Sequence, residues 1–144
     1  MRVYFSGPLF TPYERSFIDE CVARLRADGI EVFVPHESAL AAGDTSAATI
    51  FQKDWQGLSD ADAIVALLDG PMVDDGTACE IGIFYGLMQI DPAKKGIVGL
   101  LTDLRGTLRH EGHGLNLFVL GCIEAAGKVC NSMDEVAAAL ADWR

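Results

Sequence analysis

The chain has 144 residues, half of them hydrophobic, which is enough for one domain, residues 1–144, with a core of its own. Its formal net charge of −10 opposes binding to DNA, RNA or anionic membranes, so we expect no polymeric nucleic acid and no membrane as a partner. Because the sequence contains neither a basic leader followed by an apolar run nor about 18 consecutive apolar residues, we expect a cytoplasmic protein.

Strands and helices alternate along the whole chain. Apolar runs bounded by Gly, Pro or Asp predict strands, and apolar residues at three- and four-residue spacing predict helices. In chain order the predicted elements are a strand over 3–5, a helix over 12–28, a strand over 30–34, a helix over 46–58, a strand over 63–68, a helix over 76–89, a strand over 96–101, a helix over 115–126, a strand over 128–130 and a helix over 132–143.

Several local signals place the ends of these elements. Gly29 suits the left-handed end of the first helix, and Ser132 with Glu135 forms a capping box for the last one. Asp75 has the position of an N-cap for the third helix. The small residues of 39–45 predict a mobile loop, and residues 102–112 a polar loop.

Five repeats of strand and helix predict an α/β fold. Right-handed crossovers between parallel strands put helices on both faces, which makes the expected architecture a flavodoxin-like, doubly wound, five-stranded parallel sheet. Ligands of such sheets bind beyond the carboxyl ends of the strands. The segments to search for a site are therefore 6–10, 35–45, 69–80 and 102–116.

The common cofactor and metal motifs are absent. The sequence has no GxxxxGK[ST] phosphate loop and no GxGxxG after the first strand, so we expect no cofactor. Its three histidines, His36, His110 and His113, are not spaced as metal ligands, and we expect no metal. The four cysteines lie in apolar stretches without CxxC spacing, which favours buried free thiols in a reducing compartment.

Carboxylates cluster around the third strand and the helix that follows it. Asp69, Asp74 and Asp75 follow the strand, and Glu80 lies within the first two turns of the helix. The helix terminus favours an ionised Glu80, while its apolar neighbours remove water and the small residues before it, Gly76 among them, let a ligand come close. Such a carboxylate suits nucleophilic attack on an anomeric carbon.

Four segments of the chain resemble the nucleoside 2-deoxyribosyltransferase family over nearly its whole length. They are Tyr4-Phe5-Ser6-Gly7-Pro8-Leu9-Phe10, Asp54, Asp74-Asp75-Gly76-Thr77-Ala78-Cys79-Glu80-Ile81-Gly82 and Asn116-Leu117-Phe118. The DxGTxxE element after an apolar strand is the most specific of them. The resemblance implies an enzyme that transfers 2-deoxyribose between nucleobases through a covalent glycosyl-glutamate, with retention of configuration, in nucleoside salvage.

The resemblance also implies a role for individual residues. Glu80 matches the nucleophile, Tyr4 the tyrosine that orients it, and Asp54 the aspartate that manages the proton of the base. Asp74 matches the ligand of the sugar 5′-hydroxyl. Asn116 matches an asparagine that a neighbouring subunit contributes, so we expect a homodimer or a higher homo-oligomer.

Further substrate contacts are expected from residues beside these motifs. Gly7, Gly76 and Phe118 belong to the matching segments, and Phe118 stands where some relatives carry methionine. Phe10 and Trp55 either stack on a base or pack in the core. The expected partners are deoxyribonucleosides and free nucleobases.

Two alternatives remain at this point. A 2′-deoxynucleoside 5′-monophosphate N-glycosidase shares the superfamily and uses water as acceptor, but Asp74 would repel a phosphate and no Lys or Arg lies in 71–75. A phospho-receiver module shares the fold and would use Asp69. Such a module also needs an acidic pair after the first strand, where this chain has Ser6-Gly7.

Overall fold

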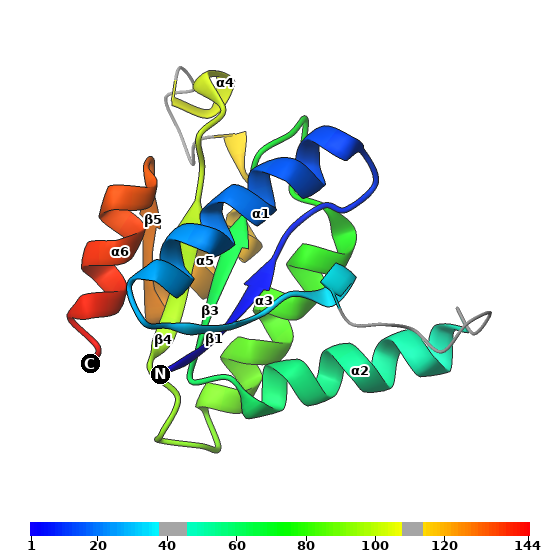
Figure 1. Cartoon of the computed structure of the whole chain (residues 1–144), viewed down its shortest axis with the longest axis vertical. Coiled ribbons are helices and arrows are strands. Elements are labelled where there is room, and N and C mark those ends of the chain that lie inside the picture. Colours follow the sequence, from blue (N-terminus) through cyan, green and yellow to red (C-terminus); the bar gives the residue numbers. More distant parts are fainter. Residues whose placement is uncertain (38–45, 108–113) are drawn as a thin grey trace.

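A five-stranded, all-parallel sheet forms the centre of the protein (Figure 1). The computed structural model describes residues 1–37, 46–107 and 114–144. The strands are β1 (Arg2–Ser6), β2 (Glu31–Phe33), β3 (Ala63–Leu67), β4 (Gly96–Leu100) and β5 (Gly127–Cys130). Their order is β2-β1-β3-β4-β5, which confirms the predicted doubly wound, flavodoxin-like architecture.

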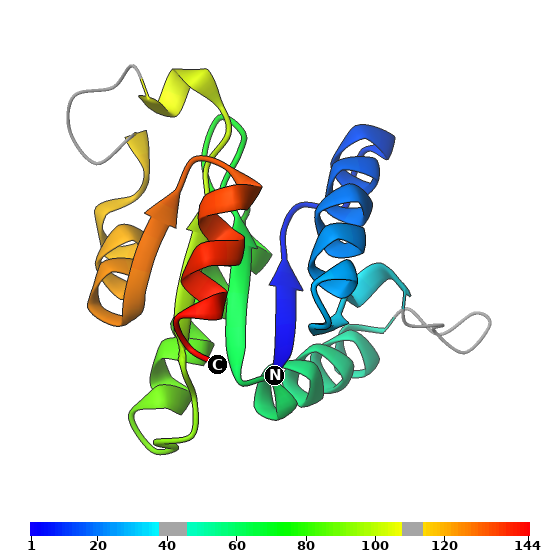
Figure 2. The ribbon, with the colours of Figure 1, turned by 60° about the vertical axis from the view of Figure 1, so that its left-hand side comes forward.

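Helices cover both faces of this sheet (Figure 2). The helices are α1 (Pro12–Ala27), the 3₁₀ turn η1 (Pro35–Glu37), α2 (Ala47–Asp60), α3 (Asp75–Met88), α4 (Leu104–Thr107), α5 (Leu117–Ala126) and α6 (Met133–Ala141). One core cluster joins α1 and α6 to the sheet, and a second joins α2, α3 and α5 to the opposite face. Among the residues that the structure describes, no helix is long and apolar enough to cross a bilayer.

Side chains of β1 alternate between the two core clusters, as the two-residue period of a strand requires. Val3 and Phe5 pack with α1 and α6, whereas Tyr4 packs in the cluster of α2, α3 and α5. Ser6 follows Tyr4 by two residues and so faces the same helices. The end of β1 therefore presents hydroxyl groups to α3.

The third helix begins at Asp75, one residue earlier than expected, so its N-cap also lies one residue earlier. Asp74 is the N-cap, with its Oδ2 accepting a hydrogen bond from the backbone N–H of Thr77 at 2.9 Å. The prediction of Asp75 as N-cap was wrong; Asp75 is exposed, and its Oδ1 accepts from the N–H of Gly76. Asp74 has the extended ψ of 140° that a cap needs, and its side chain can reach the backbone N–H of Thr77, the third residue of the helix.

Other expectations at the ends of elements have mixed outcomes. Gly29 follows α1 with a φ of +76°, as predicted for its left-handed end, and Ser132 caps α6. The loop expected over 102–112 contains the short helix α4, while the mobile loop expected over 39–45 lies outside the described residues. All four thiols are free: Cys21 and Cys130 are buried as predicted and Cys122 is half-buried, but Cys79 is exposed, so the prediction of burial was wrong there.

Candidate active site

The point where the strand order reverses, between β1 and β3, positions the candidate site. The crossovers from these two strands leave toward opposite faces, so their carboxyl ends diverge and open a crevice. Segment 6–10 enters this crevice from β1, and the beginning of α3 enters it from β3. The Asp74 cap sets the direction of α3, which places Glu80 beside the end of β1.

The carboxylate of Glu80 accepts hydrogen bonds on both oxygens from β1. The hydroxyl of Tyr4 donates to Oε1 at 2.6 Å, and the hydroxyl of Ser6 donates to Oε2. Both donors are fully buried, whereas Glu80 itself is half-buried. The two bonds fix the plane of the carboxylate, because each holds one of its oxygens from a rigid strand.

Opposing effects act on the charge of this carboxylate. Burial raises the pKa of Glu80 above its ordinary value, and the negative charges of Asp54 and Asp74 raise it further. The hydrogen bonds from Ser6 and Tyr4 favour the ionised form and oppose that rise. Burial and the nearby Glu80 charge likewise raise the pKa of Tyr4, so the phenol stays protonated and remains a donor.

A cavity of about 380 Å³ lies against Glu80 at the carboxyl edge of the sheet. Six residues predicted from the sequence line it: Gly7, Phe10, Asp54, Asp74, Gly76 and Glu80. They come from the end of β1, from α2 and from the first two turns of α3. The fold thus brings three carboxyl groups from α2 and from the beginning of α3 to one cavity, and it sets Glu80 against Tyr4 of β1, 76 residues away in the chain.

Asp54 reaches the cavity from α2 with one oxygen that makes no hydrogen bond. Its Oδ1 is buried and lies 3.6 Å from Nζ of Lys53, too far for a hydrogen bond. Burial raises the pKa of Asp54, and the Lys53 charge opposes the rise. A raised pKa makes Asp54 a better candidate than an ordinary aspartate for giving a proton to a leaving group.

Asp74 both caps α3 and faces the cavity. Its Oδ2 also accepts from the Thr77 hydroxyl at 3.1 Å, which binds this oxygen to the helix terminus. At Gly76 an added Cβ would lie 3.2 Å from the same Oδ2, so a larger residue would crowd the cap. At Gly7 an added Cβ would lie 2.9 Å from Cδ1 of Ile18, so a larger residue there would crowd the side chain of Ile18.

The two candidate stacking residues lie outside the core. Phe10 is 77% exposed and lines the cavity. Trp55 is 42% exposed, stacks on Phe51 with ring centroids 6.0 Å apart, and lines a smaller apolar hollow of about 160 Å³ that also borders Asp54 and Glu80. The alternative that these two rings pack in the core is therefore wrong for both.

Asn116 and Phe118 are not among the residues that line the cavity. Asn116 caps α5, where its Oδ1 accepts from the backbone N–H groups of Phe118 at 2.9 Å and Val119 at 3.3 Å. Leu117 and Phe118 are 72% and 82% exposed. These residues form an apolar surface at the beginning of α5 and do not reach the site of their own chain.

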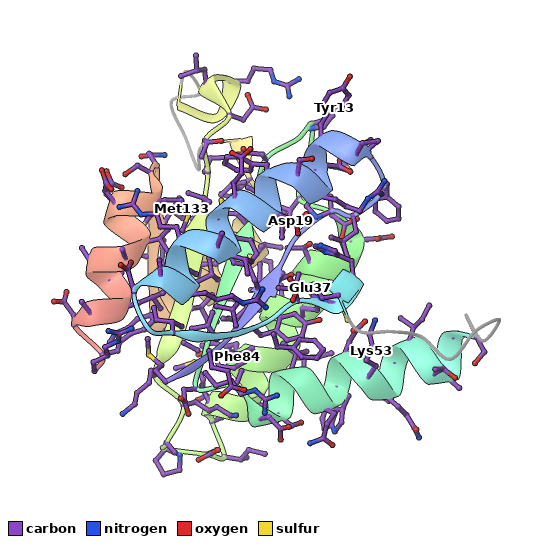
Figure 3. All side chains as sticks on the ribbon, viewed as in Figure 1. Tyr13, Asp19, Glu37, Lys53, Phe84 and Met133 are labelled. Carbon is purple, nitrogen blue, oxygen red and sulfur yellow. The ribbon has the colours of Figure 1, made fainter. Side chains whose placement is uncertain are left out.

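The residues that the sequence reasoning missed include Lys53 and His36, which line the cavity, and Ser6, which contacts Glu80 without lining it. Ser6 looked like part of a turn, although its spacing of two from Tyr4 on a strand could have revealed it. Lys53 lies on α2 (Figure 3), where Nζ donates to the carbonyl of Pro35 at 2.9 Å. His36 lines the cavity with Nε2 2.7 Å from Oδ1 of Asp19, and its position follows only from the η1 turn.

Asp69, the residue that a phospho-receiver would use, has a structural role here. Its Oδ1 accepts from the backbone N–H groups of Thr102 at 2.6 Å and Asp103 at 2.9 Å, and its Oδ2 accepts from the Thr102 hydroxyl. These bonds join the end of β3 to the end of β4. An aspartate engaged in this way is poorly placed to attack a phosphoryl group.

The arrangement is suited to glycosidic chemistry by two carboxyl groups. The carboxylate of Glu80 is held in a fixed orientation by Tyr4 and Ser6, and Asp54 lines the same cavity, which is the pair of groups that such chemistry uses. Within residues 1–37, 46–107 and 114–144 no three His, Cys, Asp or Glu side chains gather closely enough to hold a metal ion.

The chain is similar to known proteins both in sequence and in fold. The sequence model described as nucleoside 2-deoxyribosyltransferase matches residues 3–133. A conserved protein from Enterococcus faecalis V583 is similar in structure, with a TM-score of 0.83 and 27% identity over 99% of this chain and 98% of that one. No curated protein sequence matches the chain significantly.

Two further solved structures share the fold at lower identity. A 2-deoxyribosyltransferase from Bacillus psychrosaccharolyticus has a TM-score of 0.71 and 21% identity, over 95% of this chain and 90% of its own. A CMP N-glycosidase from Clostridium botulinum has a TM-score of 0.61 and 18% identity over the full length of both chains. The fold therefore occurs with transferase and with hydrolase chemistry.

Proposed function

Since the chain belongs to the nucleoside 2-deoxyribosyltransferase family, we propose that it transfers 2-deoxyribose between nucleobases of deoxyribonucleosides. One observation carries the proposal: the carboxylate of Glu80 is held through both oxygens at the wall of a cavity that Asp54 also lines. A nucleophile and a proton donor are the two groups that cleavage of an N-glycosidic bond requires.

The proposed first half-reaction forms a covalent glycosyl-enzyme. An oxygen of Glu80 attacks C1′ of the sugar, the bond between C1′ and the base nitrogen breaks, and its electron pair leaves with the base. Asp54 donates a proton to the departing base, which makes it a better leaving group. Negative charge near the sugar stabilises the oxocarbenium-like transition state, and Glu80 and Asp74 supply it.

The second half-reaction reverses the first with another base. Its nitrogen attacks C1′, the ester bond to Glu80 breaks, and Asp54 takes up the proton of the incoming base. Two displacements at the same carbon retain the configuration. We assign binding of the sugar 5′-hydroxyl to Asp74 and stacking on the base to Phe10, because both line the cavity beside these groups.

A 5′-monophosphate N-glycosidase is the second candidate. Lys53 favours it, because this cation borders the cavity and could attract a phosphate. Its ammonium group, however, is already engaged by the Pro35 carbonyl and lies near Asp54. Asp74 lines the same cavity and repels a dianion, so a nucleoside remains the better substrate.

The decisive assay incubates deoxyinosine with adenine and separates the products by chromatography. Appearance of deoxyadenosine supports transfer, whereas release of free deoxyribose without a new nucleoside supports a hydrolase. Deoxyadenosine and its 5′-monophosphate are compared in parallel, and preference for the monophosphate would overturn the proposal. The Glu80→Ala variant serves as the negative control, since it lacks the nucleophile.

We also propose that the active form is a homo-oligomer. The apolar surface at Leu117 and Phe118 gives a reason for association, and the adjacent Asn116 is a polar group that a neighbouring copy could bring to a cavity. The capping bonds leave the amide nitrogen of Asn116 available for such a contact, because only its Oδ1 binds the helix.

A further inference from the structure

We infer that Ser6 is a positioning residue for Glu80 and that its hydroxyl sets the balance between the free carboxylate and the glycosyl ester. The inference rests on the proposed function for the ester, while the contact on which it depends is visible in the free protein. Ser6 is not among the residues that line the cavity, so it acts through Glu80 and not by touching the substrate.

The geometry of β1 makes Ser6 and Tyr4 a pair. Residues two apart on a strand point to one face, and here both hydroxyls point to the same carboxylate, one to each oxygen. Both side chains are 0% exposed, so water does not compete for these bonds. With only one donor the carboxylate could rotate about the bonded oxygen, and the second donor removes that freedom.

The two bonds are strongest when Glu80 is charged. A hydroxyl bonded to a carboxylate gives a charge-assisted hydrogen bond, about twice as strong as one to a neutral acceptor. When an oxygen of Glu80 bonds to C1′, the carboxylate becomes a neutral ester, and the negative charge ends on the departing base or, once Asp54 has protonated that base, on Asp54. The hydrogen bonds then weaken.

Ser6 therefore stabilises the enzyme with intact nucleoside relative to the covalent intermediate. It counteracts burial and the charges of Asp54 and Asp74, which destabilise a charged Glu80 and so favour ester formation. Without Ser6 the intermediate should become more abundant and break down more slowly, because the departing carboxylate is less stable. This direction differs from the general loss of activity that a packing defect would cause.

The test compares Ser6→Ala with wild type and with Ser16→Ala, a matched control on the exposed side of α1. The first measurement needs no substrate: the Glu80 carboxyl carbon is titrated by NMR and identified by its loss in Glu80→Gln. We expect a higher pKa of Glu80 in Ser6→Ala and an unchanged pKa in Ser16→Ala. An unchanged pKa in Ser6→Ala would overturn the inference.

The second measurement follows the intermediate. Each protein is mixed with a deoxyribonucleoside, the reaction is quenched with acid, and the mass of the protein is measured by mass spectrometry. We expect the ratio of 2-deoxyribosyl-enzyme to free enzyme to rise roughly tenfold in Ser6→Ala, in line with the loss of one charge-assisted bond. The acidic limb of the pH profile of kcat/KM should also move to higher pH, which a merely structural role would not cause.

The two measurements separate the two claims. If wild type neither transfers deoxyribose nor carries an adduct, the proposed function fails, and the titration still decides whether Ser6 holds the Glu80 charge. If wild type is active but Ser6→Ala carries no extra adduct, the inference fails while the function stands. Should Ser6→Ala not fold, Ser6→Cys keeps the volume with a weaker donor, and its Glu80 pKa should also exceed that of wild type.

Discussion

At the scale of single residues, the protein keeps a charged group where burial disfavours charge. Glu80 is needed as a carboxylate, yet burial and two neighbouring carboxyl groups raise its pKa. The hydroxyls of Tyr4 and Ser6 stabilise the ionised form of Glu80 by hydrogen bonds. They do so without adding a positive charge, which would make the carboxylate a weaker nucleophile. The consequence is a site whose stability and activity depend on pH in opposite directions.

Glu80→Gln tests this dependence through stability. A carboxyl group whose pKa is raised on folding binds its proton more tightly in the folded state, so its contribution falls as pH rises from its unfolded pKa through its folded pKa. The stability of Glu80→Gln relative to wild type should therefore increase as the pH rises from about 4, the ordinary pKa of glutamate, through the raised pKa of Glu80. Thermal unfolding across that range measures it. The exposed Glu124→Gln should show no such slope, and a flat difference for Glu80→Gln would contradict the expectation.

Asp54→Asn tests the proton donor. The amide keeps the shape of the side chain but cannot supply a proton, so expulsion of the base should slow more than binding weakens. We expect kcat to fall roughly a hundredfold or more, with a much smaller change in KM. Steady-state kinetics with Asp142→Asn, an exposed control, measures both constants. A change confined to KM would assign Asp54 to binding alone.

At the scale of elements, the first turn of α3 combines a helix cap with substrate recognition. The side chain of Asp74 accepts hydrogen bonds from the backbone N–H and the hydroxyl of Thr77, and Asp74 also lines the cavity. A substitution can separate the two roles, because serine caps a helix nearly as well as aspartate but carries no charge.

Asp74→Ser should retain the cap and lose the repulsion of phosphate. We expect its preference for deoxyadenosine over the 5′-monophosphate to decrease and its unfolding temperature to stay near wild type. Asp74→Ala should lose the same discrimination and, in addition, about 1 kcal/mol of stability. Parallel kcat/KM values for both substrates and thermal unfolding of both variants measure these effects. Unchanged discrimination in both would remove Asp74 from the recognition of the 5′ group.

Contact between α2 and the sheet depends on the absence of a side chain at Gly57. A Cβ there would lie 2.6 Å from the ring of Phe33, which stacks on Tyr4 with centroids 5.2 Å apart. Gly57→Ala should destabilise the protein by about 1–3 kcal/mol through overpacking and lower kcat by displacing Tyr4. Gly86→Ala, with open space on α3, should instead gain up to about 1 kcal/mol. Denaturant unfolding and kinetics of the pair check the prediction; equal stability of the two variants would refute it.

At the scale of the whole molecule, the described chain leaves an apolar surface uncovered. In α5 Leu120 and Ile123 are buried against the sheet, whereas Leu117 and Phe118 face outward. A helix with apolar residues almost all round is typically buried on more than one side, whereas within the single chain α5 is buried on one. A second copy of the chain would bury the other side, as we propose for the oligomer.

Phe118→Ser should reduce the molar mass measured by light scattering, because it removes apolar area from the proposed interface. Activity should fall with the mass if Asn116 completes a neighbouring cavity. Ile90→Ser, at an exposed apolar residue after α3, is the control and should leave the mass unchanged. A Phe118→Ser protein with the mass of wild type would place the interface elsewhere.

Sequence alone determined the order of elements and the fold of this protein, because the two-residue and 3.6-residue periods of its apolar side chains are local properties. It also singled out Glu80, Asp54 and Asp74, through a spacing that matches a family. The tertiary structure decided what those carboxyl groups contact. Ser6 contacts Glu80 although 74 residues separate them in the chain, and Asp54 lines the cavity with its Oδ1 buried, because charge and burial depend on neighbours that only the folded sheet brings together.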